Sequence, residues 1–216
     1  MKLRKDTILF HSKYRLMNNE RNISKKDWLE PYNMISLYAR GAFPMADENG
    51  EIDWYMPEVR TVIPLSNYNV PRSLRKFLKT ADFQFRYDTK AIEVIKNCSK
   101  REQTWISKEL IEAYKGIQKL GHLHSVEVFQ KDKLVGGLYG VTYKGAFFGE
   151  SMFSNVSQAS KAALVKLIER LIERGFSLLD VQYQTEHLSM FGAIEIQFSE
   201  FAEMLVKSYK NDVTFL

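Results

Sequence analysis

The pattern of hydrophobic and polar positions is most distinctive in the middle of the chain, at residues 134–153 (LVGGLYGVTYKGAFFGESMF). Two runs rich in β-branched and aromatic residues, 134–143 and 146–153, flank the pair Lys144-Gly145, which predicts a β-hairpin. Glycines inside the runs weaken a strand unless another group approaches the backbone closely. Glu150 stands in an otherwise apolar stretch, where a carboxylate must be paired, hydrated or used. We therefore expect this hairpin to form the floor of a binding site.

A helix and a buried strand follow the hairpin along the chain. Apolar residues recur at helical spacing over 163–172, and Gly175 is placed to end the helix. The run LLDVQ at 178–182 predicts a buried strand on which Asp180 and Gln182 share one side. Two polar side chains on an apolar strand are costly unless they are satisfied. The remaining pattern predicts a short helix over 185–191, a strand over 193–196 and a helix over 198–209.

The chain before the hairpin predicts short helices and strands in alternation. Pro31 suits the first turn of a helix, and Ser107 suits an N-cap. His122 and His124 lie two apart, but no third ligand is nearby, so structural hydrogen bonding is favoured over a metal site. We expect helices over 26–40 with a break near Pro31, 71–80, 89–98 and 107–120, and strands over 52–55, 61–65, 83–87 and 124–130.

These elements predict an α/β (α+β) fold built from more than one part. We expect an N-terminal extension of uncertain order over 1–33, a small α/β domain over 34–100, and a larger domain over 101–216. In the larger domain the predicted order of elements is strand, hairpin, long helix, strand, short helix, strand. This is the layout of acetyltransferase-like (GNAT-type) folds. A layout by itself does not establish a function. The chain also lacks the Rossmann, P-loop and nucleophile-elbow motifs.

The charge balance is mildly basic. The 216 residues are 45% hydrophobic, which suffices for a sizeable core, and the formal net charge is +5. Such an excess is compatible with a nucleic-acid partner but is weak evidence for one. Four basic residues share part of one surface of the predicted helix 71–80; without other information we favour a solvated face over a phosphate-contacting one. They are Arg72, Arg75, Lys76 and Lys79.

The single cysteine indicates the redox environment in which the protein is expected to work. Cys98 excludes an internal disulfide framework and suits a reducing cytoplasm. The N-terminus has no apolar region long enough for a signal peptide, and no run approaches the ~20 apolar residues that span a bilayer. We therefore expect a soluble cytoplasmic protein without a membrane partner.

Ten short segments occur in an order and spacing typical of one family. They are YARGAFP (38–44), WYMPEVR (54–60), RSLRK (72–76), TWI (104–106), EAYKGIQKLGHLHSVEV (112–128), LVGGLYGV (134–141), FFGESMFS (147–154), ASKAAL (159–164), LLDVQ (178–182) and HLSMFGAIEI (187–196). The chain resembles the leucyl/phenylalanyl-tRNA–protein transferases over roughly residues 34–205. The combination of GESMFS with LGH-x-HS-x-EV is highly specific.

The resemblance implies an activity and its partners. Such enzymes transfer leucine, phenylalanine or methionine from aminoacyl-tRNA to the α-amine of proteins that begin with Lys or Arg, which marks those proteins for degradation. The partners implied are aminoacyl-tRNA and these acceptor proteins, with no cofactor and no metal, and we expect a monomer. Asp180 and Gln182 match a polar pair that assists the attacking amine, and Glu150 matches a carboxylate at the aminoacyl pocket.

The resemblance also implies binding roles for other residues. Leu138, Phe147 and Met152 match the apolar walls of the aminoacyl pocket, and the basic helix 71–80 matches a surface for the tRNA acceptor stem. The residues that match the surroundings of the terminal adenosine are Tyr38, Met45, Trp105 and Tyr114. Met45 stands where the family usually has Trp, and the family's Gly-Gly-Asp-Leu segment is not found before the first helix.

Two other functions stay open from the residues alone. An acyl-CoA-dependent N-acyltransferase would keep the fold, but the pyrophosphate-binding loop expected before the long helix is not present at 151–160. A non-catalytic protein that binds tRNA or protein N-termini would bind tRNA without forming product.

Overall fold

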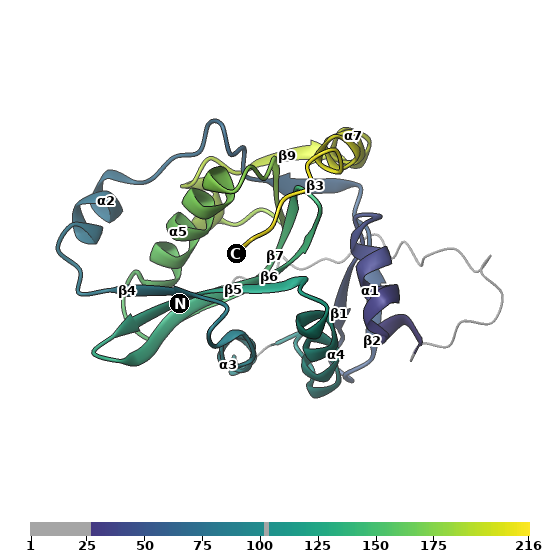
Figure 1. Cartoon of the computed structure of the whole chain (residues 1–216), viewed down its shortest axis with the longest axis horizontal. Coiled ribbons are helices and arrows are strands. Elements are labelled where there is room, and N and C mark those ends of the chain that lie inside the picture. The colour runs from purple at the N-terminus through teal and green to yellow at the C-terminus, as the bar shows by residue number, and fades with distance from the viewer. Residues whose placement is uncertain (1–26, 102–103) are drawn as a thin grey trace.

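The computed structural model describes residues 27–101 and 104–216 (Figure 1). Most of the N-terminal extension expected over 1–33 lies outside the described residues. The helices are η1 (Asp27–Leu29), α1 (Pro31–Tyr38), α2 (Arg72–Leu78), α3 (Ala91–Cys98), α4 (Lys108–Lys119), α5 (Ala159–Glu173), α6 (Glu186–Ser189) and α7 (Phe198–Ser208). The strands are β1 (Phe43–Ala46), β2 (Ile52–Tyr55), β3 (Val59–Val62), β4 (Gln84–Tyr87), β5 (Leu123–Gln130), β6 (Lys133–Tyr143), β7 (Ala146–Ser154), β8 (Leu178–Gln182) and β9 (Ile194–Gln197).

A mixed sheet forms the centre of the molecule and confirms the α/β class. In the described part of the chain it has seven strands in the order β4-β5-β6-β7-β8-β3-β9, and β1 pairs with β2 in a separate ribbon. The β7–β8 pair is parallel, and the other neighbouring pairs are antiparallel. Strands β3 and β4 come from the first hundred residues, yet they share this sheet with the later strands. The domain boundaries predicted from the sequence stay a prediction.

Helices cover both faces of the sheet (Figure 1). Helices α1, α3 and α4 pack on one face, where α7 also lies beside β3 and β9. Helix α5 covers the other face, with α2 packed on α5. The segment that follows α7 returns to this second face, and Phe215 is buried there beside Phe147 and Phe176. The two faces hold two separate hydrophobic clusters, so the sheet between them is buried along most of its length.

The central hairpin is confirmed at nearly the predicted residues. Strands β6 and β7 pair from Tyr143 and Ala146 to Gly136 and Ser154, with a register shift between Tyr139 and Gly140 that leaves Glu150 unpaired in the ladder. Lys144 takes the positive φ of +51° in the connection. Glycine within β6 is explained by close packing: a Cβ on Gly136 would lie 2.5 Å from the Cβ of Ala159 on α5. A Cβ on Gly140 would meet the Phe147 ring and the Phe148 carbonyl at 2.3 Å. Gly136 therefore lets α5 approach the sheet closely, and Gly140 leaves room for groups of the neighbouring strand β7.

Local signals also place several helix ends correctly. Pro31 begins α1, and the Ser107 hydroxyl accepts a hydrogen bond from the Leu110 amide at 3.1 Å. The strand predicted over 61–65 is wrong at both ends, because β3 begins at Val59 beside β9 and stops before Pro64, which has no amide to donate. Ile172, placed in the apolar stripe of α5, is 45% exposed.

The two histidines make structural hydrogen bonds. The Nδ1 atom of His122 lies 2.9 Å from the Thr142 carbonyl, and that of His124 lies 2.7 Å from an Asp88 carboxylate oxygen. Among residues 27–101 and 104–216, no group of three or more His, Cys, Asp or Glu side chains could hold a metal ion. No helix in the described part of the chain is long and apolar enough to cross a membrane.

Candidate active site

The two central parallel strands part in the middle of the sheet. Pairing between β7 and β8 joins Ala146–Phe148 to Leu178–Asp180. Beyond this point β7 continues along β6 only, whereas the end of β8 pairs with β3 through Gln182 and Thr61. Glu150 on β7 and Gln182 on β8 therefore lie where the strands separate, and this opening organises the candidate site.

Gln182 occupies a strained turn at the end of β8. The Tyr183 amide donates to the Val181 carbonyl at 2.8 Å, and Gln182 between them has a φ of +65°. This is a γ-turn of the rare positive-φ type, which is strained for a residue other than glycine. The pairing register of β8 with β3 shifts at the same place. The turn leaves the Gln182 side-chain amide donating to Oε1 of Glu150 at 3.1 Å.

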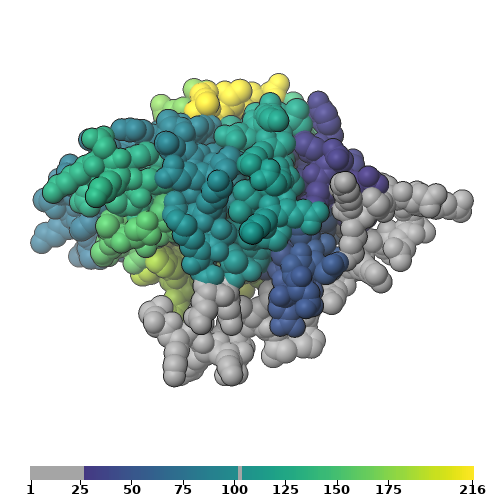
Figure 2. Space-filling view, turned by 90° about the horizontal axis from the view of Figure 1, so that it is seen from below, coloured from purple at the N-terminus to yellow at the C-terminus, as the bar shows by residue number. Residues whose placement is uncertain are grey.

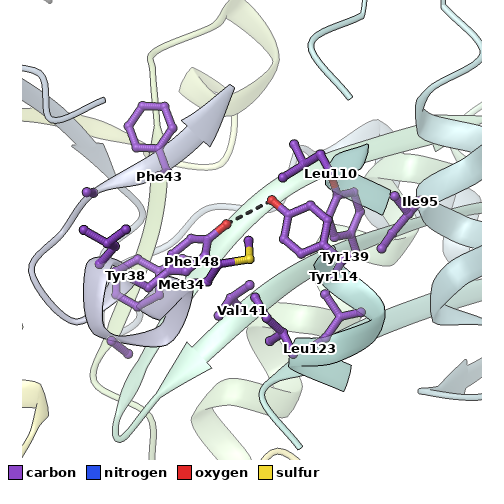
Figure 3. Close-up of a cluster of buried hydrophobic side chains, with 14 of the residues drawn as sticks. Met34, Tyr38, Phe43, Ile95, Leu110, Tyr114, Leu123, Tyr139, Val141 and Phe148 are labelled. Carbon is purple, nitrogen blue, oxygen red and sulfur yellow. Dashed lines mark hydrogen bonds between the residues drawn. The ribbon is translucent and has the colours of Figure 1, made fainter. Parts of the chain in front are cut away.

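The Glu150 carboxylate lies at the centre of a hydrogen-bond network. Its Oε1 also accepts from the Tyr38 hydroxyl at 2.9 Å, and its Oε2 accepts from the Tyr114 hydroxyl at 3.0 Å. The two tyrosine hydroxyls are joined to each other at 2.9 Å (Figure 3). Burial raises the pKa of Glu150 to about 7 and the nearby charge of Asp180 adds to this, while the two tyrosine hydrogen bonds and Arg60 oppose it. The carboxyl group can therefore exchange a proton near neutral pH.

A buried ion pair next to this network holds Gln182 in position. Arg60 on β3 donates from Nε to Oδ1 of Asp180 at 2.8 Å and from Nη2 to Oδ2 at 2.5 Å, and both side chains are fully buried. The guanidinium lies between the rings of Phe43 and Phe201, 4.6 and 4.7 Å from their centroids. Asp180 Oδ1 accepts in addition from the Gln182 backbone amide at 2.9 Å. The ion pair thereby fixes the turn that presents Gln182.

Arg60 is not among the site residues predicted from the sequence. A signal for a partner existed, because Asp180 on an apolar strand needs one for its charge, but Arg60 stands just before the predicted strand 61–65 and was not singled out. The sequence alone does not show that these two residues meet across 120 positions. Asp180 cannot touch a substrate in this structure, because it is fully buried and Arg60 engages both of its oxygens.

The three residues predicted to line the aminoacyl pocket lie together. Leu138 pairs directly with Met152 across β6 and β7, and Phe147 is on β7, all within the cluster covered by α5. Leu138 and Phe147 are buried, whereas Met152 is half-buried and belongs to the part of β7 that has left β8. Tyr38 and Tyr114, which bind the Glu150 carboxylate, belong to the cluster on the other face of the sheet, so these three residues do not share a face with the Glu150 network. Their roles stay a prediction.

The four residues predicted near the terminal adenosine divide into two pairs. Met45 and Trp105 are half-buried, and the Ala46 amide donates to the Trp105 carbonyl at 3.0 Å, which brings their segments together. Tyr38 and Tyr114 are fully buried and contact Glu150 instead. Neither tyrosine ring offers a face to a nucleoside in this structure, so only Met45 and Trp105 are placed for such a contact.

The basic helix lies apart from the Glu150 network. All four side chains predicted to contact tRNA, those of Arg72, Arg75, Lys76 and Lys79, are exposed on α2. Helix α2 lies at the opposite end of the molecule from α1 and the β1–β2 ribbon (Figure 2). These residues therefore form a separate charged surface.

Comparison with known proteins agrees with this arrangement. Residues 62–206 match the family model described as leucyl/phenylalanyl-tRNA protein transferase, and residues 28–58 match the model of the N-terminal domain of the same family. A curated relative from Herpetosiphon aurantiacus, named leucyl/phenylalanyl-tRNA–protein transferase, is 47% identical over 188 residues, which are 87% of this chain and 98% of the relative. These matches place the chain among the aminoacyltransferases. It belongs to the leucyl/phenylalanyl-tRNA–protein transferase family.

A solved structure, titled the structure of L-PGS from Bacillus licheniformis, is a more distant match. It covers 74% of this chain and 55% of its own, with 11% sequence identity and a TM-score of 0.40. At this distance the likeness supports no argument about fold or activity.

Proposed function

We propose that this protein transfers leucine, phenylalanine or methionine from aminoacyl-tRNA to the α-amine of proteins that begin with Lys or Arg. The observation that supports the proposal best is the network of Glu150, Gln182 and Asp180 at the point where β7 and β8 separate, in a chain that belongs to this family. The network combines a proton-exchanging carboxyl group, an oriented amide and a buried ion pair.

The reaction needs positioning and the handling of one proton. The acceptor amine attacks the ester carbonyl of the aminoacyl-tRNA, an amide bond forms, and the bond to the ribose oxygen breaks. The proton lost by the amine ends on that ribose oxygen. The ester is already activated, so the enzyme gains most from holding the two substrates in reacting geometry. A thiol intermediate is not part of the proposal, since burial raises the pKa of Cys98, the lone thiol, to about 12.

Gln182 is the residue placed to meet the acceptor amine. Its side-chain nitrogen donates to Glu150, so its side-chain oxygen is the atom that it can present to an N–H group. Asp180 and Arg60 act through Gln182, because Asp180 holds the Gln182 backbone amide and Arg60 holds Asp180. Glu150, with a pKa near 7, attracts an ammonium group when ionised and shares the proton that the amine releases.

The remaining substrate contacts follow the family resemblance. Leu138, Phe147 and Met152 receive the donor side chain, and the flexible Met152 suits a pocket that accepts several unbranched-at-Cβ side chains. Met45 and Trp105 face the terminal adenosine, and the exposed basic residues of α2 contact the acceptor stem. We place the enzyme in the cytoplasm, in keeping with its lone buried cysteine, and we expect it to act as a monomer.

A transfer assay tests the proposal directly. Purified protein is mixed with tRNA charged with leucine, phenylalanine or methionine and with a peptide that begins with Lys, Arg or, as a control, Glu; mass spectrometry then detects the added residue. We expect a mass gain on the Lys and Arg peptides only, and loss of at least 100-fold in rate for Gln182→Ala. Tight tRNA binding without any product would indicate a binding protein and contradict the proposal.

A further inference from the structure

A cavity opens at the edge of the sheet on the far side of β3 from β8. Its volume is about 280 Å³, and Met56, Glu58, Gln197, Phe198 and Ser199 line it. These residues come from the loop between β2 and β3 and from the junction of β9 with α7. The cavity thus combines apolar surface from Met56 and Phe198 with polar groups at its rim.

Among the described residues, nothing pairs with the outer edge of the strand beside the cavity. Strand β9 is the last strand of the sheet in the described part of the chain, and it pairs on one side only, with β3. Ile194 on β9 and Val59 on β3 are 46% and 42% exposed. An exposed strand edge with apolar side chains is a template for an added extended segment, whose backbone supplies the missing hydrogen bonds.

The candidate active site is within reach of this edge. Gln182, Thr61 and Glu195 lie in one row across β8, β3 and β9. Neighbouring strands are ~4.8 Å apart, so two strand spacings put Glu195 about 10 Å from Gln182. The cavity begins two residues further along β9, at Gln197, which lies about 12 Å from Gln182 by the same spacings. An extended chain advances about 3.4 Å per residue, and roughly four residues therefore span this distance. Tyr183, which follows Gln182 and is 39% exposed, begins the path from the site.

The charge around the cavity is opposite to that of the whole chain. Residues 41–59 and 183–206, which meet at the cavity, carry five and four acidic residues and no Lys or Arg, whereas the chain has a net charge of +5. Glu58, Glu195 and Glu200 are exposed beside the cavity. Such a surface repels the tRNA backbone and attracts a positively charged polypeptide.

We propose that the free edge of β9 and the adjoining cavity form the docking surface for the acceptor protein. The occupant is the extended segment that follows the acceptor's basic first residue, and an apolar side chain about four residues downstream enters the cavity. This inference rests on the proposed function and adds a second site of recognition, by which the enzyme selects acceptors through more than their first residue. Acidic residues in the same segment are selected against.

The test compares long and short acceptors in the transfer assay. The long acceptor is a ten-residue peptide that begins with Lys and has Leu at its fifth position, and the short acceptor is a Lys dipeptide. In Ser199→Trp the new side chain fills the cavity; Ser66→Trp, in the loop before α2, is the matched control. We expect Ser199→Trp to raise the KM for the long peptide about tenfold, as expected when one apolar side chain is no longer buried. The KM for the dipeptide and for aminoacyl-tRNA stays unchanged.

A charge reversal tests the same surface without filling the cavity. Glu195→Lys combined with Glu200→Lys is expected to raise the KM for the long peptide about tenfold at low salt and less at high salt, whereas the control Glu112→Lys on α4 leaves it unchanged. The inference is overturned if both sets of variants keep the KM for the long peptide within twofold of the wild-type value. It is also overturned if they raise the KM for the dipeptide or for aminoacyl-tRNA by the same factor as the KM for the long peptide. Wild-type protein that transfers nothing to either acceptor refutes the proposed function instead.

Discussion

Replacing Glu150 by Gln should stabilise the protein at pH 8 and leave it nearly unchanged at pH 5. Burial raises the pKa of this carboxyl from 4.5 to about 7, so its ionisation costs up to about 3 kcal/mol more in the folded chain than in the unfolded chain. Part of the side chain reaches solvent, so we expect about 1–3 kcal/mol. Gln fits the site, because the Tyr114 hydroxyl can accept from the new side-chain nitrogen and donate to the Tyr38 hydroxyl, which still donates to the side-chain oxygen.

The sign of the pH dependence follows from the direction of this pKa change. Below pH 4.5 the carboxyl is protonated in both states. Between pH 4.5 and 7 the folded chain binds more protons than the unfolded chain, so the stability of the wild type falls as the pH rises. Above pH 7 the wild type has lost all of this stability, whereas Glu150→Gln has no carboxyl group at this position and loses none of it. The stability gained by Glu150→Gln should therefore appear between these two pH values.

Urea unfolding of both proteins from pH 5 to pH 8 measures the effect. We expect the difference in the free energy of unfolding to grow across this range and then level off. Tyr114→Phe removes a hydrogen bond that opposes the rise in pKa, so the fall in stability should still begin near pH 4.5 but continue to higher pH. A difference between Glu150→Gln and the wild type that is constant from pH 5 to pH 8 would refute this account of Glu150. Under the proposed function the stabilised variant should also lose transfer activity.

Three further changes test other parts of the structure. Arg60→Met leaves Asp180 charged, buried and unpaired, so it should cost about 3–5 kcal/mol of unfolding free energy in urea, and adding Asp180→Asn should restore part of this; a double variant no more stable than the single one would contradict the ion-pair argument. Phe215→Ala removes a buried ring that lies 4.6 Å from the His124 ring and 5.7 Å from the Phe147 ring, and should cost about 3–5 kcal/mol; a loss below 1 kcal/mol would show that this segment is not part of the core. A third variant changes the four basic residues of α2, Arg72, Arg75, Lys76 and Lys79, to Gln. It should keep the free energy of unfolding within about 0.5 kcal/mol, but it should bind aminoacyl-tRNA more weakly and with a smaller salt dependence. An unchanged Kd for aminoacyl-tRNA at low salt would mean that α2 is only a solvated face.

Much of the local structure is predictable because its causes are local. The hairpin of β6 and β7 follows from two strand-like runs around Lys144-Gly145, and the N-cap of α4 follows from Ser107. Strand β3 was harder to place, because its ends depend on pairing with β8 and β9, which are more than a hundred residues away. A short strand held by distant partners carries little periodicity of its own.

The candidate site shows the same division between local and distant causes. Glu150, Asp180 and Gln182 could be singled out because polar groups in apolar runs need a reason to be there. Their connections could not be predicted: the strained turn at Gln182, the tyrosine hydroxyls on Glu150 and the partner of Asp180 all depend on how separate elements pack. Tyr38 and Tyr114 were accordingly expected near a nucleoside, whereas their hydroxyl groups bind Glu150.

The sequence by itself determined the class of fold, the central hairpin, the helix that covers it and the polar residues that need partners, because turn chemistry and apolar periodicity act over a few residues. Only the tertiary structure decided that β3 lies between β8 and β9, that Arg60 neutralises Asp180, and that a cavity forms between the β2–β3 loop and the start of α7. The physical reason is that buried charges and unpaired strand edges are satisfied by whichever groups the whole chain brings near, and that is a property of packing rather than of any one segment.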